Sequence, residues 1–182
     1  MKKLFVIIIS LMLMSSCTTT KEAQSSKVEL RKEKKLTNQL LVKNAVESRR
    51  YIIKFDRLYS SHGGISELIP RANFIIIDGE RAIISTAYLG RQFDIKPIVG
   101  INIRGRAVDY ALTDNLSKGS YKIEMKVKNG GTSSFNLNLT ISKNGYCNAS
   151  VSNLKIDNLR YSGYLVPILD ASTPSFKEGD PI

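Results

Sequence analysis

Apolar and polar residues alternate along three segments near the end of the chain. In "YKIEMKVK" (121–128) every second residue is apolar and the residues between are charged, and "FNLNLTI" (135–141) and "CNASV" (147–151) repeat this period of two. Successive side chains of a strand point to opposite faces, so each segment predicts a strand with one buried and one solvated face. This pattern is typical of antiparallel sheets.

The turn after the second of these strands predicts its register. Residues opposite each other in an antiparallel pair point to the same face, so apolar residues must face apolar residues. A three-residue loop at 143–145 places Ile141 opposite Cys147, and it gives Gly145 the positive φ that a type I turn with a bulge requires. We therefore predict that Cys147 is a structural, core-facing residue rather than a reactive one.

The same reasoning applies to the preceding turn. A loop at 129–131 places Met125 opposite Phe135 and Ile123 opposite Leu137, again apolar against apolar. Together the two turns predict a three-stranded meander from Tyr121 to Val151.

Further strands are expected upstream and downstream of the meander. "YIIKFDRLY" (51–59) places Tyr51, Ile53, Phe55 and Tyr59 on one face. "NFIIIDG" and "RAIISTAYLG" predict two apolar strands joined at Asp78-Gly79, 60–72 reads as a loop, and 106–112 and 158–168 predict two more strands. The expected fold class is mainly β, an antiparallel β-sandwich or flattened barrel of about seven strands with one N-terminal helix, the β domain at 51–170 and a loose tail at 171–182.

The N-terminal helix is predicted within a basic segment, 28–50. "LTNQLLVKNAVESRR" has Leu36, Leu40, Leu41, Ala45 and Ser48 at helical spacing without Gly or Pro, which predicts an amphipathic helix from about Leu30 to Ser48. The chain carries a formal net charge of +11, and 27–54 contributes nine basic residues against three acidic ones. Cations close to an anionic membrane surface contribute about 1 kcal/mol each. We therefore consider Lys32, Lys34 and Lys35 for contact with a membrane or a partner, with a solvated helix face as the alternative.

The first residues of the chain resemble a bacterial lipoprotein signal. Lys2 and Lys3 precede an apolar run that is shorter than the roughly 20 residues of a membrane-spanning helix. "LMSSC" resembles a lipobox, which predicts a signal peptide at 1–16, lipid attachment at Cys17 and a flexible tether at 17–27. The alternative is an ordinary cleaved signal with an incidental cysteine. Because no Asp follows Cys17, we expect an outer-membrane lipoprotein of the cell envelope that faces the periplasm.

Catalytic chemistry has little support in the sequence. His62 is the single histidine, no motif presents a nucleophile to it, and no spacing of metal ligands or phosphate-binding loop occurs. Asp78, Asp94, Asp109 and Asp114 lie near turns and strand ends, where Asp bonds locally. We expect no cofactor and no metal, and a location outside the cytoplasm disfavours nucleic acid as a partner.

Two function classes remain open, besides a purely structural accessory subunit. The first is a non-enzymatic envelope lipoprotein whose β domain binds an unknown protein or glycan ligand. Tyr161 and Tyr164 point to opposite faces of one strand, so at least one of them is expected within reach of a sugar or peptide. The alternative is a hydrolase acting on cell-wall or dietary polymer, with His62 or a pair of Asp residues in a cleft.

The order of motifs adds a resemblance to a known family. A lipobox and a basic helix precede "RRYIIKFDRLY", "NFIIIDGERAIISTAYLGR", "GINIRGRAVDYALTD", "SKNGYCNASV" and "LRYSGYLVPI". Over most of 45–168 the chain resembles the Bacteroidota lipoprotein family named domain of unknown function four-two-five-one. The resemblance implies a lipid-anchored, all-β envelope protein, and it implies neither an activity nor functional residues.

The lipid anchor is testable by removing the residue that would carry it. A Cys17→Ala variant should leave the membrane fraction, because two or more acyl chains anchor a protein stably and this variant has no sulfur to acylate. Fractionation followed by immunodetection measures the change. Membrane association that persists in the variant contradicts the prediction.

Overall fold

The structure is a computed structural model that describes residues 19–59, 63–88, 99–131, 134–153 and 158–169. The predicted signal peptide and lipid attachment at Cys17, together with His62, Asp94 and the predicted tail at 171–182, lie outside the described residues. The chain divides into two units, 1–37 and 38–182. The boundary falls within a helix, so the two parts of that helix are described separately below.

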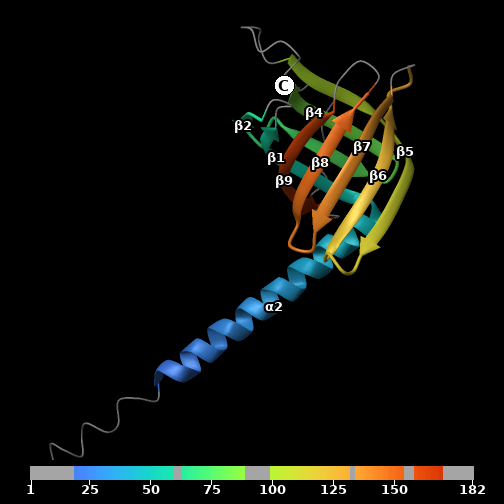
Figure 1. Cartoon of the computed structure of the whole chain (residues 1–182). Helices are drawn as coiled ribbons and strands as arrows, with labels where there is room; N and C mark the ends of the chain where they lie inside the picture. The colour runs from blue at the N-terminus through green and yellow to red at the C-terminus, as the bar shows by residue number, and fades with distance from the viewer. Residues whose placement is uncertain (1–18, 60–62, 89–98, 132–133, 154–157, 170–182) are drawn as a thin grey trace, which may run out of the picture. The chain divides into compact units, whose positions relative to one another are not determined.

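The helix, α2, spans Thr19–Ser48 and contains 30 residues (Figure 1). It begins well before the predicted start near Leu30, and it takes in most of the segment that was expected to be a flexible tether. Ser and Thr cost a helix only a few tenths of a kcal/mol each, and no Gly or Pro interrupts the segment. The composition of 19–27 is therefore compatible with a helix.

The C-terminal turns of α2 bury a different face from the predicted one. Val42, Ala45 and Val46 are 1%, 4% and 0% exposed and belong to the core, whereas Leu40 is 60% exposed. Of the five residues predicted to form the apolar face, Ala45 is the one buried in the core. Since Val42, Ala45 and Val46 follow the helical spacing i, i+3, i+4, two competing apolar stripes were present in the sequence, and packing selected the smaller residues.

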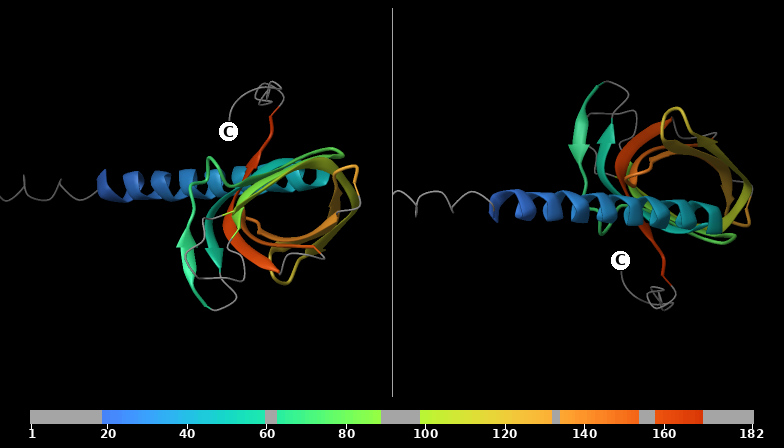
Figure 2. Two further views of the ribbon diagram at one scale, coloured as in Figure 1. Left: turned by 90° about the horizontal axis from the view of Figure 1, so that it is seen from above. Right: turned by 90° about the horizontal axis from the view of Figure 1, so that it is seen from below.

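Nine strands follow α2 along the chain. Their bounds are Arg50–Tyr59 (β1), Ile65–Glu67 (β2), Phe74–Asp78 (β3), Arg81–Tyr88 (β4), Val99–Asn115 (β5), Ser120–Lys128 (β6), Ser134–Ser142 (β7), Tyr146–Ser152 (β8) and Leu159–Pro167 (β9). β1 and β3 to β9 pair in the order β1-β3-β4-β5-β6-β7-β8-β9, and β9 pairs back with β1. All pairings are antiparallel, so eight strands close into a barrel (Figure 2), and β2 adds to the edge of β1.

The predicted fold class is therefore confirmed: the chain is mainly β, with a single N-terminal helix and a barrel rather than a sandwich. The strand missing from the sequence analysis is the short β2, which lies in the segment read as a loop. β5 is also longer than the predicted strand at 106–112, because it runs through the glycine-containing segment at 99–105.

The register predicted for the β7–β8 hairpin is confirmed. Ile141 pairs with Cys147 and Leu137 with Val151, and Gly145 has a φ of +90°. Cys147 is fully buried, and this burial raises the pKa of its thiol well above the ordinary value. The residue is thus core-facing, as its place in the alternation predicts.

The register predicted for β6 and β7 is wrong by two residues. Met125 pairs with Leu137 and Val127 with Phe135, and the pairing of Lys128 with Ser134 leaves 129–133 as the connection. A shift by two keeps every side chain on its own face. The apolar pattern therefore fits both registers equally well, and the length of the loop decides between them.

A β-bulge in β1 overturns the prediction for Tyr59. Phe55 pairs with Gly163 and Arg57 with Ser162, so Asp56 is an extra residue without a partner in this ladder. Such a bulge shifts the alternation of all following residues by one. As a result Leu58, at 1% exposure, occupies the core position, and Tyr59 lies on the outer side of the barrel.

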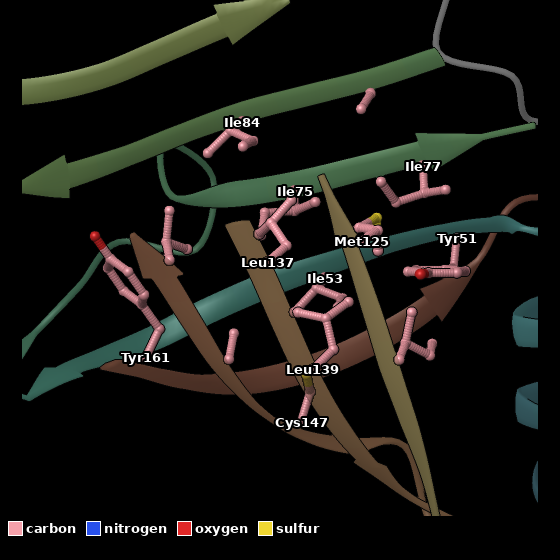
Figure 3. Packing of buried hydrophobic residues seen from close by; sticks show 14 of the residues in the cluster. Tyr51, Ile53, Ile75, Ile77, Ile84, Met125, Leu137, Leu139, Cys147 and Tyr161 are labelled. Carbon is pink, nitrogen blue, oxygen red and sulfur yellow. The ribbon is translucent and has the colours of Figure 1, made fainter. Parts of the chain in front are cut away.

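Apolar side chains fill the interior of the barrel, as Figure 3 shows for Ile53, Ile75, Leu137 and Leu139. The buried tyrosine hydroxyls have partners near the ends of the barrel. The Tyr161 hydroxyl donates to the carbonyl oxygen of Ala87 at 2.9 Å. At the end covered by α2, the Tyr110 hydroxyl donates to the carbonyl oxygen of Val46 at 2.9 Å and lies 3.4 Å from the Tyr51 hydroxyl.

The corner between α2 and β1 depends on a residue with unusual backbone geometry. Arg49 has a φ of +56°, the left-handed conformation in which many helices end. Its guanidinium lies 4.4 Å from the centre of the Tyr110 ring, and its carbonyl accepts a hydrogen bond from the N–H of Gly79 at 2.9 Å. These contacts hold a non-glycine residue in a conformation that costs about 1–3 kcal/mol.

The seam between β1 and β9 requires glycine at one position. A Cβ built on Gly163 would lie within 3.0 Å of the carbonyl group of Lys54 and the Cα of Phe55, closer than real Cβ atoms approach. Both obstacles are backbone, so neither strand can yield without opening the ladder that closes the barrel. Gly163 is thus a packing requirement of barrel closure.

We predict that Gly163→Ala destabilises the barrel by about 1–3 kcal/mol, the usual cost of overpacking a core. Gly100→Ala is the matched control, since a Cβ there meets an ordinary contact at 3.9 Å, and it should change stability by less than about 0.5 kcal/mol. Urea unfolding followed by circular dichroism measures both. Equal destabilisation by Gly163→Ala and Gly100→Ala would contradict the requirement for glycine at position 163.

The burial of Cys147 predicts slow reaction with thiol reagents. In a Cys17→Ala variant Cys147 is the single remaining thiol. Its labelling by a disulfide reagent at pH 8 should be slower by about two orders of magnitude or more than in denaturant, because the thiol must wait for local opening. Rapid labelling without denaturant would contradict the register.

Candidate functional site

The outer face of the barrel changes character between β6 and the next two strands. On β6 the outward residues are charged: Lys122, Glu124, Lys126 and Lys128. On β7 and β8 the outward positions carry neutral amides and hydroxyls, which are Asn136, Asn138, Thr140, Asn148, Ser150 and Ser152. In a chain with 24% charged residues, two neighbouring strands without an outward charge at these positions form a distinct surface.

Strand register arranges these residues in two polar rows across β7, β8, β9 and β1, where β7 to β9 lie side by side (Figure 1). Opposite side chains on one face of a sheet are in contact range, so each row is a continuous line of polar groups. The first polar row is Asn138, Ser150, Arg160 and Tyr59, and the second polar row is Thr140, Asn148, Ser162 and Arg57.

A surface hollow of about 480 Å³ lies over these rows. It is an open depression rather than an enclosed cavity, and its lining combines both rows with two residues of the underlying strands. The lining residues are Tyr59, Asn138, Thr140, Asn148, Ala149, Ser150, Arg160 and Tyr161.

Hydrogen bonds hold the β1 side of the hollow in place. The hydroxyls of Tyr59 and Ser162 are 3.2 Å apart, and the Ser162 hydroxyl donates to Oδ1 of Asp56 at 3.2 Å. Ser162 is fully buried under these neighbours although it faces outward. Hydrogen bonding to Ser162, and secondarily to Tyr146 and Arg57, lowers the pKa of Tyr59 against the opposing effect of burial. The bulge residue Asp56 thus anchors Tyr59 at the edge of the hollow.

Two more tyrosines continue the surface beyond the second polar row. Tyr146 and Tyr164 are partners in the β8–β9 ladder, and their rings meet edge to face with centroids 5.4 Å apart. Tyr164 is 52% exposed, whereas Tyr161 on the opposite face of β9 is 1% exposed. The tyrosine that the sequence analysis placed within reach of a ligand is therefore Tyr164.

The hollow offers hydrogen bonding but little acid–base chemistry. Asn side chains supply both donors and acceptors, and Thr and Ser hydroxyls do the same. No hydrogen bond within the described part of the chain occupies the side chains of Asn138, Thr140 or Asn148. The eight residues that line the hollow include no carboxylate, histidine or cysteine.

The other candidate residues are not brought together. Asp78 pairs with Arg50 at 3.4 Å and with Arg81 at 2.8 Å, and Asp109 pairs with Lys126 at 3.1 Å. Lys32, Lys34 and Lys35 are exposed on α2. Among the described residues, no cluster of three or more His, Cys, Asp or Glu could hold a metal ion. No helix in the described ranges is long and apolar enough to cross a membrane.

A third row of paired residues on the outer face is apolar. Val166, Ile52, Ile76 and Ile83 are successive partners across β9, β1, β3 and β4. Ile76 is 6% exposed although it faces outward, because its neighbours in the row lie on both sides of it. This row explains the uninterrupted apolar runs of β3 and β4, which bury side chains on both faces.

Comparison with known proteins places the chain in a family. The family model "Domain of unknown function (DUF4251)" matches residues 32–165, which is most of the chain. The chain belongs to the DUF4251 family. A DUF4251 protein from Bacteroides eggerthii, known from its crystal structure, is 15% identical with a TM-score of 0.62, and the match covers 72% of this chain and 88% of that one. No curated protein matches the chain.

The resemblance found in the sequence is thereby confirmed, and the likeness to the Bacteroides protein shows a shared fold. The segment matched by the DUF4251 model contains both polar rows, from Arg57 to Ser162. This member of the DUF4251 family is a filled barrel with a polar outer surface on β7 to β9. Sequence analysis missed this surface, although the neutral residues of "NLNLT" and "CNAS" at outward positions were its visible signal.

Proposed function

We propose that this protein is a lipid-anchored lipoprotein of the cell envelope whose barrel binds a hydroxyl-rich ligand, a glycan, without catalysis. The resemblance of "LMSSC" to a lipobox supports the anchor at Cys17, and the absence of Asp after Cys17 supports the outer membrane, where we place the domain on the periplasmic side. The observation that carries the binding function is the hollow over the two polar rows, where unoccupied amide and hydroxyl side chains lie beside the half-buried ring of Tyr59 and near the exposed ring of Tyr164.

The chemistry of the hollow matches that of a sugar. Sugar hydroxyls both donate and accept hydrogen bonds, and the side chains of Asn138, Thr140 and Asn148 can do the same. Tyrosine rings supply large, rigid contact area at low entropic cost and suit the apolar face of a sugar ring. Tyr59 borders the hollow and Tyr164 lies beyond the second polar row, so ring faces and hydrogen-bonding groups lie on one surface.

The packing of the barrel directs binding to its outer face. An eight-stranded barrel is just wide enough for side chains to fill it or for one small ligand. Here Phe55 and Tyr161 stack inside with ring centroids 4.8 Å apart, and aliphatic side chains occupy the space around them. A ligand entering this part of the interior would have to displace core residues.

The alternative, a hydrolase acting on cell-wall or dietary polymer, gains less support from this surface. Glycosidases generally need two carboxylates that flank the scissile bond. Three carboxylates in the described ranges lie close to the polar rows. Asp56 is half-buried and accepts a hydrogen bond from Ser162, Glu124 opposite Asn138 is ion-paired with Lys122 at 2.8 Å, and Glu67 lies opposite Arg57 on β2. The lining residues supply no second acid.

Glycan binding is testable with a pair of matched variants. Asn138→Ala combined with Asn148→Ala should weaken binding to array-selected oligosaccharides by about tenfold or more, because each lost hydrogen bond costs about 1 kcal/mol. Asn136→Ala is the control, since Asn136 faces outward on the same strand but does not line the hollow. Isothermal titration calorimetry measures the affinities.

Two outcomes count against the proposal. Absence of binding to every glycan on the array overturns it, and so does equal weakening by the control. Release of new reducing ends from a bound polysaccharide would support the hydrolase alternative instead.

A further inference from the structure

The two polar rows contain two charges, both of them arginines. Arg160 lies in the first polar row between Ser150 and Tyr59, and Arg57 ends the second polar row. Both are exposed. They lie on adjacent strands at diagonal positions, within reach of one group bound between them. Asp56 adjoins Arg57 and Glu67 lies opposite it on β2, whereas the ladder partners of Arg160 are the neutral residues Ser150 and Tyr59. The positive charge of the rows without an acidic neighbour in its ladder is therefore Arg160.

In the described part of the chain, Arg160 lacks the acidic partner that several other arginines of the barrel have. Arg50 and Arg81 are ion-paired with Asp78, and Arg106 is ion-paired with Glu80. Within the described residues neither Arg57 nor Arg160 makes an ion pair. Asp56, which accepts a hydrogen bond from Ser162, still attracts the guanidinium of Arg57, so Arg160 is the freer of the two. An arginine beside a hollow and without a partner can bind an anion from solution.

The guanidinium group favours a planar anion. Its fork of N–H donors matches a carboxylate through two parallel hydrogen bonds, a geometry that an ammonium group does not offer. Arg160 lines the hollow directly, and Arg57 is hydrogen-bonded with Tyr59 at its edge. The ligand's carboxylate would therefore lie at the β9–β1 side while its hydroxyls lie over Asn138 and Asn148.

From this arrangement we propose that the ligand is an acidic glycan containing uronic acid, and that Arg160 binds its carboxylate. The proposal rests on the proposed function and adds the class of sugar. Tyr59 and Arg57 position the sugar acid from β1, and the neutral amides of β7 and β8 bind the hydroxyls.

The test compares sugars that differ only in charge. Oligomers of galacturonate, glucuronate and mannuronate, and their methyl esters, are titrated into the protein at low and moderate salt. The wild type should prefer at least one acid over its ester by about tenfold, as expected for a charge-assisted bidentate pair. Arg160→Gln should remove this preference while it keeps the affinity for the ester, and Arg160→Lys should restore part of it.

A control separates recognition from the attraction of any basic protein for any anion. Arg104→Gln removes the same charge from an exposed position on β5, outside both polar rows, and it should leave the preference unchanged. Three results overturn the inference while leaving glycan binding intact: equal affinity for all acids and esters, a preference that survives Arg160→Gln, or equal loss in Arg104→Gln. Binding of no glycan of any kind overturns the proposed function as well.

Discussion

The closure of the barrel between β1 and β9 is the constraint on which the rest of the structure depends. The first and last strands of the barrel are far apart in the chain, and their pairing from Tyr51 with Pro167 to Tyr59 with Arg160 turns an open sheet into a closed barrel. Gly163 permits the close approach of the two backbones, and the bulge at Asp56 absorbs the resulting mismatch in register. Both irregularities lie at the same point of the seam.

The seam also places the candidate site. Because the bulge shifts the alternation, Leu58 replaces Tyr59 in the core, and Tyr59 turns outward beside Arg160. Closure brings β1 next to β9, which extends the neutral rows of β7 and β8 to an aromatic ring and two arginines. The same closure packs the interior with apolar side chains and with Val42 and Val46 of α2. Binding chemistry is thereby concentrated on the outer face.

Local pattern predicted those parts of the fold that depend on local rules. Alternation and a glycine with positive φ were sufficient for the β7–β8 hairpin and for the burial of Cys147. For β6 and β7, two registers that differ by two residues bury the same side chains. The apolar pattern therefore could not distinguish between these registers. The bulge at Asp56 has no local signal, because long-range pairing with Gly163 creates it. The polar rows depend on three strand registers at once, so no single segment reveals them. His62 and Asp94, the residues considered for catalysis that lie outside the described ranges, gave no guide to them.

The central claim is that this protein binds its ligand on the outer face of β7, β8 and β9 rather than inside the barrel. Backbone amide spectra of the ¹⁵N-labelled protein, recorded while a bound oligosaccharide is titrated in, test it most directly. The account predicts shifts concentrated around Asn138, Asn148, Arg160 and Tyr59. Shifts centred on the interior or on the apolar row at Ile76, or no change at all, would contradict it.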